Sequence, residues 1–355
     1  MSEFFHALGL AAPVIQAPMA GVQNHRLTAA VCNAGGLGAL PAAMLSASDL
    51  QAQLQALSQA TDKPYNVNFF CHAVPTPDAA KEAAWRQQLL PHYRELGLDA
   101  TNIPGGPGRV PFNHDSADVL APFRPAVVSF HFGLPSAELV DRVKSWGSLV
   151  LSSATTVEEA LWLQDHGVDV VIAQGLEAGG HRGMFLTSDV STQMGSMALL
   201  PQIVEAVRVP VIAAGGIAHA AGVQAAKALG AAGVQIGTAY LCSDEATTSV
   251  LHRAALQSAA AQHTALTNVF TGRPARGIVN RLMRELGPIS AAAPAFPLAT
   301  AAITPLRAAA EARQSSDFTP LWAGQNASRV QAKPAAQITQ NAIQAWHQAA
   351  KEKAA

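Results

Sequence analysis

The sequence has few of the residues that would point away from a compact enzyme. Its 355 residues include only three cysteines, Cys32, Cys71 and Cys242, which are far apart and odd in number. They suit a reducing compartment better than a disulfide framework. Only 13% of the residues are charged, the formal net charge is -1, and no long run carries one sign. We therefore expect neither a nucleic acid nor an anionic membrane as the main partner.

The sequence also lacks membrane-spanning and signal-peptide segments and metal-ligand motifs, which limits where the protein acts and what chemistry it uses. No uninterrupted apolar run is long enough to span a bilayer, and residues 1–10 lack the basic and apolar regions of a signal peptide. We therefore expect a cytoplasmic protein with no membrane partner. The twelve histidines show no metal-ligand spacing, so the sequence predicts no metal site.

What the sequence does contain is a regular series of short apolar runs that end on turn-forming residues. The runs are 14–19, 37–41, 65–70, 126–133, 149–155, 168–175, 209–216 and 233–239. Helix-like stretches separate most of them, such as 157–166 and 218–229. This alternation predicts a parallel sheet, and about eight strands favour an α/β fold closed into a (β/α)8 TIM barrel. A doubly wound open sheet is the alternative, disfavoured because no GxGxxG follows the first run.

Two stretches interrupt this rhythm. The segment 78–124 begins helically and becomes loop-like through 103–108, where it could cover the barrel mouth. Residues 245–320 are mostly Ala-rich and predict a smaller, mostly helical capping subdomain over the site. A final helix near 335–351 should return to the barrel. The expected division is a barrel of 1–244 and 321–355 with a cap of 245–320.

The most specific local feature is the segment VVIAQGLEAGGHRG at 170–183. An apolar run ends at Gln174 and passes into a glycine-rich loop that carries His181. Glycine lets a backbone pass close to a ligand, and barrel enzymes carry their acid or base just after a strand end. We therefore predict that His181 is catalytic, and that an ion pair between Glu177 and Arg182 orders its loop.

Glycine turns follow the last two predicted strands, at Gly215–Gly216 and at Gly237. In TIM barrels the loops after these strands commonly bind phosphate with a helix N-terminus, and Thr238 could add a hydroxyl donor. The alternative is that these glycines only make tight turns. A phosphate anchor without a metal motif indicates a phosphorylated cofactor or substrate. FMN fits because its ring could then lie across the barrel mouth.

Polar side chains at other predicted strand ends suit the edge of a flavin ring. Asn68, Gln174 and the segment 16–19 with Met19 lie at such ends, and amides offer both donors and acceptors. Turn capping is the alternative for Asn68. His131 ends the fourth predicted strand, where it either packs or lines the substrate pocket.

Several segments together resemble nitronate monooxygenases, formerly called 2-nitropropane dioxygenases, and most closely their bacterial class I group. They are QAPMAGV at 16–22, SFHFG at 129–133, SATT at 153–156, AQGLEAGGHRG at 173–183 and LWAGQ at 321–325. The likeness covers nearly the whole chain. It implies a TIM barrel with a smaller capping domain and tightly, non-covalently bound FMN. It also implies oxidation of alkyl nitronates, including propionate 3-nitronate, by O2 to a carbonyl compound and nitrite.

The resemblance also implies roles for individual residues. His181 corresponds to the catalytic histidine of the family. Protonated, it could hold a nitronate anion, and neutral, it could deprotonate a nitroalkane; for an ionised nitronate we favour holding. With the turns described above, the expected cofactor contacts are Met19, Asn68, Gln174, Gly179, Gly180, Gly215, Gly216, Gln235, Ile236, Gly237 and Thr238.

One departure from the family concerns the substrate. Where the family is tyrosine-rich before a late proline-rich turn, this chain reads AFPL at 295–298, and it has only three tyrosines. Fewer phenol donors predict a less polar nitronate, or weaker binding of carboxylated ones.

Two alternative functions remain open at this stage. One is an NAD(P)H-dependent FMN reductase for quinones or enoyl thioesters on a similar barrel, and the other is a non-catalytic flavin- or phosphate-binding protein. In any of these cases we expect a monomer or homodimer.

Overall fold

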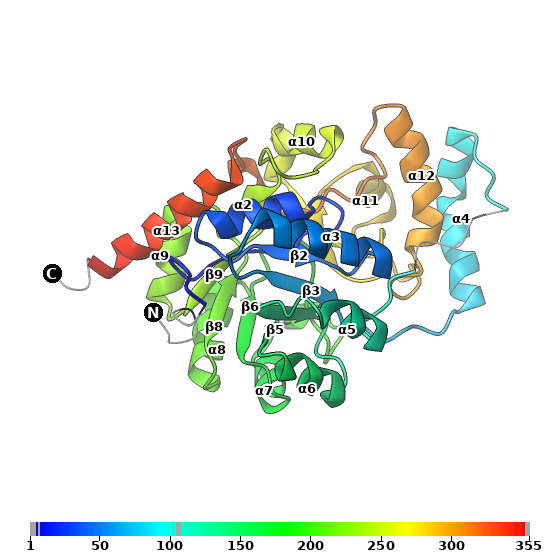
Figure 1. Cartoon of the computed structure of the whole chain (residues 1–355). Helices are drawn as coiled ribbons and strands as arrows, with labels where there is room; N and C mark the ends of the chain where they lie inside the picture. Colours follow the sequence, from blue (N-terminus) through cyan, green and yellow to red (C-terminus); the bar gives the residue numbers. More distant parts are fainter. Residues whose placement is uncertain (1–4, 6–7, 102, 104–107, 352–355) are drawn as a thin grey trace.

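The computed structural model describes residues 5, 8–101, 103 and 108–351. Its centre is an eight-stranded parallel sheet in the order β1-β9-β8-β6-β5-β4-β3-β2 (Figure 1). The strands are β1 (Val14–Gln16), β2 (Ala39–Pro41), β3 (Asn66–Phe70), β4 (Val127–His131), β5 (Leu149–Ala154), β6 (Val170–Gln174), β8 (Val211–Ala214) and β9 (Gly233–Ile236). Each lies within one of the predicted apolar runs.

The sheet closes where β1 meets the residues before β2. Gln16 N donates to the Leu37 carbonyl at 2.9 Å, and Leu37 N donates to the Val14 carbonyl at 2.9 Å. Side chains alternate along the strands, so that Ile15 and Ile172 join one buried cluster while Val14 joins another. These features confirm the predicted (β/α)8 TIM barrel.

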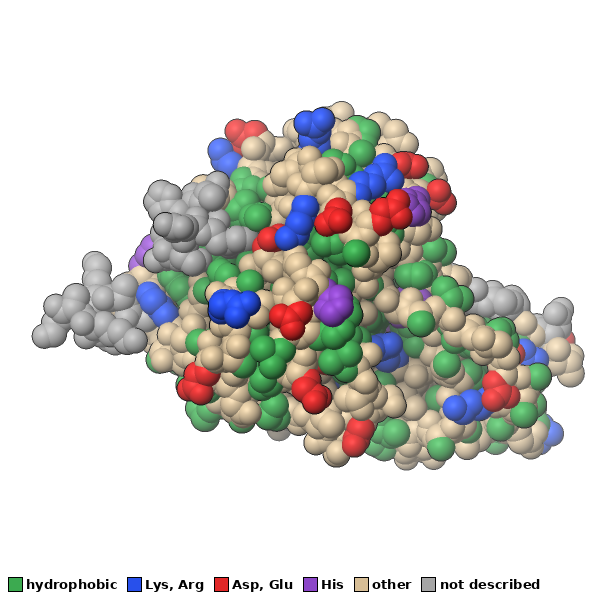
Figure 2. All heavy atoms as spheres, turned by 90° about the horizontal axis from the view of Figure 1, so that it is seen from below, with side chains coloured by type: hydrophobic (Ala, Val, Ile, Leu, Met, Phe, Trp, Pro, Cys, Tyr) green, Lys and Arg blue, Asp and Glu red, His purple; other side chains and the backbone are tan. Residues whose placement is uncertain are grey.

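Helices surround the barrel on the outside. They are α2 (His25–Asn33), α3 (Ala47–Ala60), α5 (His114–Leu120), α6 (Ala137–Ser145), α7 (Val157–Asp165), α8 (Ser196–Ala206), α9 (Ala220–Ala228) and α13 (Ala335–Lys351). The final helix α13 returns to the barrel and runs beside α9 and α2, as predicted (Figure 1). Within the described residues, no helix combines the length and apolarity needed to cross a membrane. Acidic and basic side chains are interspersed over the face in Figure 2.

Four further helices lie outside this ring. α4 (Ala79–Leu96), α11 (Arg281–Leu286) and α12 (Thr300–Ala312) share one hydrophobic cluster, whereas α10 (Val250–Leu256) packs in another. In Figure 1, α4 and α12 lie side by side. Tyr93 Oη donates to the Ala302 carbonyl at 2.7 Å, and both helices share one hydrophobic cluster. We therefore propose that α4 be counted with the predicted 245–320 cap. Residues 104–107 of the predicted mouth-covering loop lie outside the described residues.

The structure also contains a small antiparallel sheet that the sequence did not predict. Its order is β10 (Thr264–Thr267), β11 (Ala275–Ile278) and β7 (Gly180–His181). His181 lies opposite Ala275 in this pairing, and Gly180 lies opposite Arg276. The sheet thus joins the loop after β6 to a segment nearly a hundred residues later in the chain.

Gly38 gives a test of how tightly the barrel packs on α2. A Cβ at this position would overlap the Thr28 carbonyl group, with the carbonyl carbon at 2.8 Å and Cys32 Sγ at 2.9 Å. We expect Gly38→Ala to lower the free energy of unfolding by about 3 kcal/mol or more, as overpacking does. Urea unfolding measures this.

The matched control is Gly97→Ala, where an added Cβ meets nothing within 4 Å but φ is +72°. Its cost should be limited to about 1 kcal/mol of backbone strain. Equal losses for the two variants would contradict the packing described at Gly38.

Candidate active site

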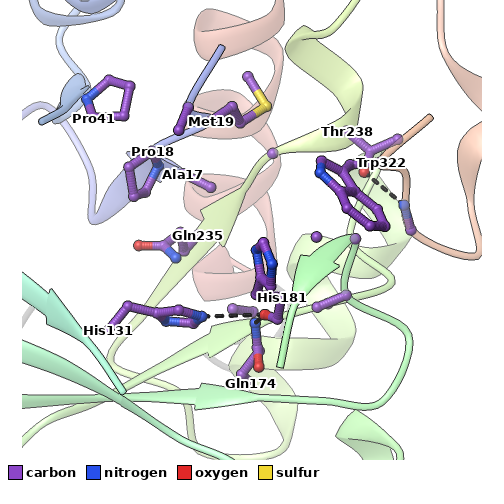
Figure 3. A pocket seen from close by; sticks show the side chains of 18 of the residues that line it. Ala17, Pro18, Met19, Pro41, His131, Gln174, His181, Gln235, Thr238 and Trp322 are labelled. Atoms are coloured by element: carbon purple, nitrogen blue, oxygen red, sulfur yellow. Dashed lines mark hydrogen bonds between the residues drawn. The ribbon is translucent and has the colours of Figure 1, made fainter. Parts of the chain in front are cut away.

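A cavity opens at the carboxyl ends of the barrel strands, with about 1460 Å³ of space between atoms, part of it open to solvent (Figure 3). The predicted residues that line it are Met19, Asn68, His131, Gln174, Gly179, Gly180, His181, Gly215, Gly216, Gln235, Gly237 and Thr238. Ile236 does not line it, and its side chain packs in the hydrophobic cluster between the strands and the surrounding helices. The cavity is of the kind that holds a cofactor and a substrate together.

The backbone of His181 is held from the barrel side. Its carbonyl oxygen accepts from Gln174 Nε2 at 3.0 Å and from His131 Nε2 at 3.1 Å. The other end of the Gln174 amide accepts from Gly183 N at 2.7 Å. Gln174 therefore bonds to the backbone at His181 and at Gly183. In Figure 3, Gln174 lies below His181, and the His131 ring points toward the His181 carbonyl.

Arg182 turns back beneath the loop and is fully buried. Its guanidinium donates to the Gly175 carbonyl at 2.7 Å, the Gln174 carbonyl at 2.6 Å and Gln193 Oε1 at 2.8 Å. Glu177 does not pair with it, since both carboxylate oxygens accept from Ser196 N, at 3.0 and 2.9 Å. The predicted ion pair between Glu177 and Arg182 was wrong: strand-end carbonyls satisfy the arginine, and a helix N-terminus satisfies the glutamate.

The chain that leaves the loop is held by the buried carboxylate of Glu159, on α7. Its Oε1 accepts from Phe185 N at 2.5 Å and from Leu186 N at 3.3 Å. Its Oε2 accepts from the Thr155 backbone and hydroxyl, both at 2.7 Å. The segment on either side of His181 is therefore bonded to the ends of the barrel strands and to a barrel helix.

The imidazole of His181 stands among aromatic rings in the cavity. Ring centroids lie 5.3 Å away for Phe296 and 5.6 Å for Trp322, and Nε2 lies 2.9 Å from Thr271 Oγ1. Burial, and then the charge of Arg109, lower the His181 pKa well below its ordinary value. His181 is therefore neutral at neutral pH. Burial therefore favours the neutral imidazole, which suits the base role that the sequence offered as the alternative, and the choice between base and anion holder stays a prediction.

His131 is also neutral, and its hydrogen bonds define its tautomer. Burial lowers its pKa to about 3, against the opposing effect of the His181 carbonyl. Nε2 must carry the proton that the carbonyl accepts, so Nδ1 accepts from the Ser153 hydroxyl at 3.0 Å. His131 both lines the cavity and positions the catalytic loop, which the sequence had left open.

The sequence missed several residues around His181. They are Arg109, Thr271, Arg273, Phe296 and Trp322. Trp322 lies in the LWAGQ segment and Phe296 in the AFPL segment, both of which the comparison with the family had marked, so those segments could have suggested them. Arg109, Thr271 and Arg273 come from the capping segment or from the loop after α4, where no local pattern points to a barrel site.

Comparisons with known proteins agree with this geometry. The sequence profile of the nitronate monooxygenase family matches residues 2–344. A nitronate monooxygenase of Paraburkholderia phytofirmans is 41% identical over 93% of this chain and 91% of its own length. One from Pseudomonas aeruginosa is 39% identical over 96% and 98%. The chain belongs to the nitronate monooxygenase family.

Solved structures support the same assignment. Nitroalkane oxidase from Streptomyces ansochromogenes has a TM-score of 0.89 and 36% identity, covering 98% of this chain and 99% of that one. FabK from Thermotoga maritima has a TM-score of 0.73 at 24% identity, covering 100% and 98%, which shows a shared fold. This family member is thus an enzyme, a flavin-dependent monooxygenase.

The two glycine turns fit the phosphate of a flavin nucleotide. Ala214 pairs with Gln235 between β8 and β9, so Gly215–Gly216 and Gly237–Thr238 follow side by side. Gly215 and Gly216 have φ of +109° and +71°, a backbone that favours glycine. Their N–H groups and the uncapped start of α9 suit an anion.

The chain that follows the cap closes over these turns. Thr238 Oγ1 accepts from Gly324 N at 3.0 Å, and Asn326 Nδ2 donates to the Gly216 carbonyl. A Cβ on Gly179 would lie 2.5 Å from Gly324 N, so only glycine fits there. The loop after β6 and the segment 322–326 therefore meet at the phosphate end of the cavity.

Polar groups elsewhere in the cavity suit the ring of a flavin. Gln235 Oε1 is buried without a hydrogen-bond partner, as an acceptor awaiting a ligand donor would be. Asn68 Nδ2 already donates to Ser129, and both ends of the Gln174 amide are engaged. The described residues hold no His/Cys/Asp/Glu cluster that could bind a metal ion. The residues present thus fit a flavin mononucleotide, and the individual contacts stay predictions.

The phosphate end of this assignment can be tested at Gly216. Gly216→Val adds a side chain where the phosphate would approach the backbone, so the variant should purify with little or no flavin. Absorbance near the flavin band relative to protein absorbance measures occupancy. Gly147→Val is the control, because Gly147 shares a positive φ, of +81°, but lies away from the cavity. A Cβ there meets nothing within 4 Å, and at Gly216 it makes only ordinary contact with the Glu177 side chain, at 3.5 Å. Full flavin occupancy in Gly216→Val would place the phosphate elsewhere.

The buried, neutral His131 predicts an acid-dependent loss of stability. The unfolded chain takes up a proton near pH 6.5, whereas the folded protein does so only near the lowered pKa of about 3. Stability from this group is therefore complete above pH 6.5 and falls by about 1.4 kcal/mol per pH unit below it. Urea unfolding at pH 7 and 5 should show the cost of His131→Gln shrinking by about 2 kcal/mol at the lower pH.

The buried Ser152 on β5 provides a control that does not titrate. Ser152→Ala should change the free energy of unfolding equally at both pH values, because a hydroxyl neither gains nor loses a proton over this range. If the cost of His131→Gln is the same at pH 7 and pH 5, His131 is not held neutral in the folded protein.

Proposed function

We propose that this enzyme oxidises alkyl nitronates, including propionate 3-nitronate, with bound FMN and O2, to a carbonyl compound and nitrite. When bound, FMN supplies an electron-accepting ring that takes electrons from the nitronate and passes them to oxygen. The observation that carries the proposal is the placement of a neutral His181 in the same cavity as the paired glycine turns. The family membership and the nitroalkane oxidase likeness support it.

His181 acts as the base, and its Nδ1 is the atom that accepts the proton. The Thr271 hydroxyl lies 3.4 Å from the Arg273 carbonyl, to which it can donate, leaving its lone pair for His181 Nε2–H. Nδ1 of His181 then has a lone pair, and no described residue is bonded to it. This atom can take a proton from the carbon of a neutral nitroalkane. A substrate that arrives as the nitronate needs no such step.

The surrounding rings exclude water and orient the substrate. Phe296, Trp322 and Phe132 each lie with their centroids within 6.0 Å of the His181 ring. A nitronate between them meets an apolar wall and one nitrogen base. The low dielectric of this enclosure strengthens every charged contact that the substrate makes there.

The setting of the enzyme follows from the sequence. We propose a cytoplasmic monomer or homodimer that acts on a small molecule, without a nucleic-acid or membrane partner. Cys32, Cys71 and Cys242 are all free thiols in the structure, which supports a reducing compartment.

The proposal is tested by mixing the flavin-loaded enzyme with propionate 3-nitronate without oxygen and following the flavin absorbance. We expect prompt bleaching, and nitrite after air is admitted. Bleaching by NADH together with no reaction toward the nitronate would favour a reductase instead. An enzyme that bleaches with neither compound would contradict catalysis of this class.

The role of His181 is tested by comparing a nitroalkane with its own nitronate. His181→Asn should lower kcat/KM for nitroethane by about 10²–10⁴-fold, because the base is lost. For ethyl nitronate the loss should stay below about tenfold, since only a hydrogen bond changes. His166→Asn, on the barrel surface, is the control and should alter neither value. Equal losses for both substrates would show that His181 is not a base.

A further inference from the structure

The end of the cavity near His181 has an unpaired positive charge. Arg109 lies in the loop between α4 and α5 and lines the cavity. Its Nη1 is buried and has no hydrogen-bond partner. Among the described residues that line the cavity, Glu177 is the single acidic one. Its carboxylate accepts from Ser196 N, beside the glycine turns. No acidic side chain of the described lining therefore offers Arg109 a partner.

Aromatic contacts place Arg109 close to the catalytic histidine. Its Cζ lies 5.2 Å from the centroid of the Phe296 ring, and that ring lies 5.3 Å from the ring of His181. The Arg109 carbonyl accepts from His72 Nε2 at 3.0 Å, which anchors the loop backbone. Of the charged groups that lower the His181 pKa, Arg109 has the largest effect. The Phe296 ring thus contacts both the Arg109 guanidinium and the catalytic His181.

The other two arginines of this region, Arg182 and Arg273, either have hydrogen-bond partners for their donors or lie outside the cavity lining. Arg182 makes three hydrogen bonds to carbonyl groups. Arg273 stacks on Phe132, with Cζ 3.9 Å from the ring centroid, and donates to the Met184 carbonyl. Arg273 is also absent from the cavity lining. Of these three arginines, Arg109 is the one that both lines the cavity and has a donor without a hydrogen-bond partner.

Arg109 is half-buried, and its buried Nη1 lacks an anionic partner, which is unfavourable unless a ligand supplies one. Guanidinium donors match a carboxylate in a two-point arrangement that an uncharged alkyl tail cannot make. We propose that Arg109 is a specificity-determining residue, which binds a carboxylate carried by the substrate at the end opposite its nitronate group. This inference rests on the proposed nitronate oxidation and names which nitronates the site prefers. It reverses the expectation that a tyrosine-poor pocket binds carboxylated nitronates weakly.

The test compares two nitronates that differ in the carboxylate. Arg109→Met should lower kcat/KM for propionate 3-nitronate by about 10–100-fold, mainly through KM, as the loss of a charge-assisted hydrogen bond does. For propyl-1-nitronate, kcat/KM should change less than about threefold. Arg109→Lys should recover part of the preference, because it keeps the charge without the planar fork.

The surface variant Arg208→Gln controls for the change in net charge and should behave as the wild type. Equal losses for both nitronates in Arg109→Met would show a structural role, and no loss for either would place the carboxylate elsewhere. Both results overturn the proposal.

A binding measurement separates this inference from the proposed reaction. Succinate has the shape and charges of propionate 3-nitronate but is not oxidised. Calorimetric titration should give a Kd for Arg109→Met at least about tenfold weaker than for the flavin-loaded wild type. This holds whether or not the enzyme turns over nitronates, so failed turnover with intact succinate binding would remove only the proposed reaction. Equal Kd values, or no binding to the wild type, would overturn the role of Arg109.

Discussion

The pairing of β7 with β11 is the contact on which the active site depends. Two residues, Gly180 and His181, form the edge of a sheet whose other strands come from the capping segment. The barrel holds the same loop from below through Gln174 and His131. Because neither side alone determines where the imidazole stands, the barrel and the small sheet must both be in place before the site exists.

The same closure sets the protonation state of the site. Rings from the barrel and the cap surround His181, and burial in that enclosure removes the water that would stabilise an imidazolium. A neutral imidazole does not hold an anion by charge. That task passes to a residue whose cation survives burial, and Arg109 remains protonated even with a lowered pKa.

The parts predictable from sequence are those whose signal is local. Buried parallel strands read as apolar runs, and a barrel brings their carboxyl ends to one rim, so strand-end residues such as Gln174 and Gly216 could be grouped without a structure. The strands β10 and β11 read TALT and ARGI, which carry little apolar alternation. Arg109 reaches the site through a loop whose helix α4 packs on α12, more than 200 residues away, and no local pattern encodes that contact.

The arrangement of charges around the loop explains which form of the substrate the site suits. Glu159 and Glu177 both lie near the loop, yet their oxygens are taken up by backbone N–H groups and a threonine hydroxyl rather than by arginines. Arg182 donates to carbonyl groups. Arg273 donates to the Met184 carbonyl and stacks on Phe132, while its Nε has no partner, so a direct ion pair cancels neither charge. With Arg109, three arginine charges around the loop stand against the two glutamate charges, and this balance favours a bound anion over its neutral acid. Such a balance favours the nitronate over the nitroalkane from which it ionises.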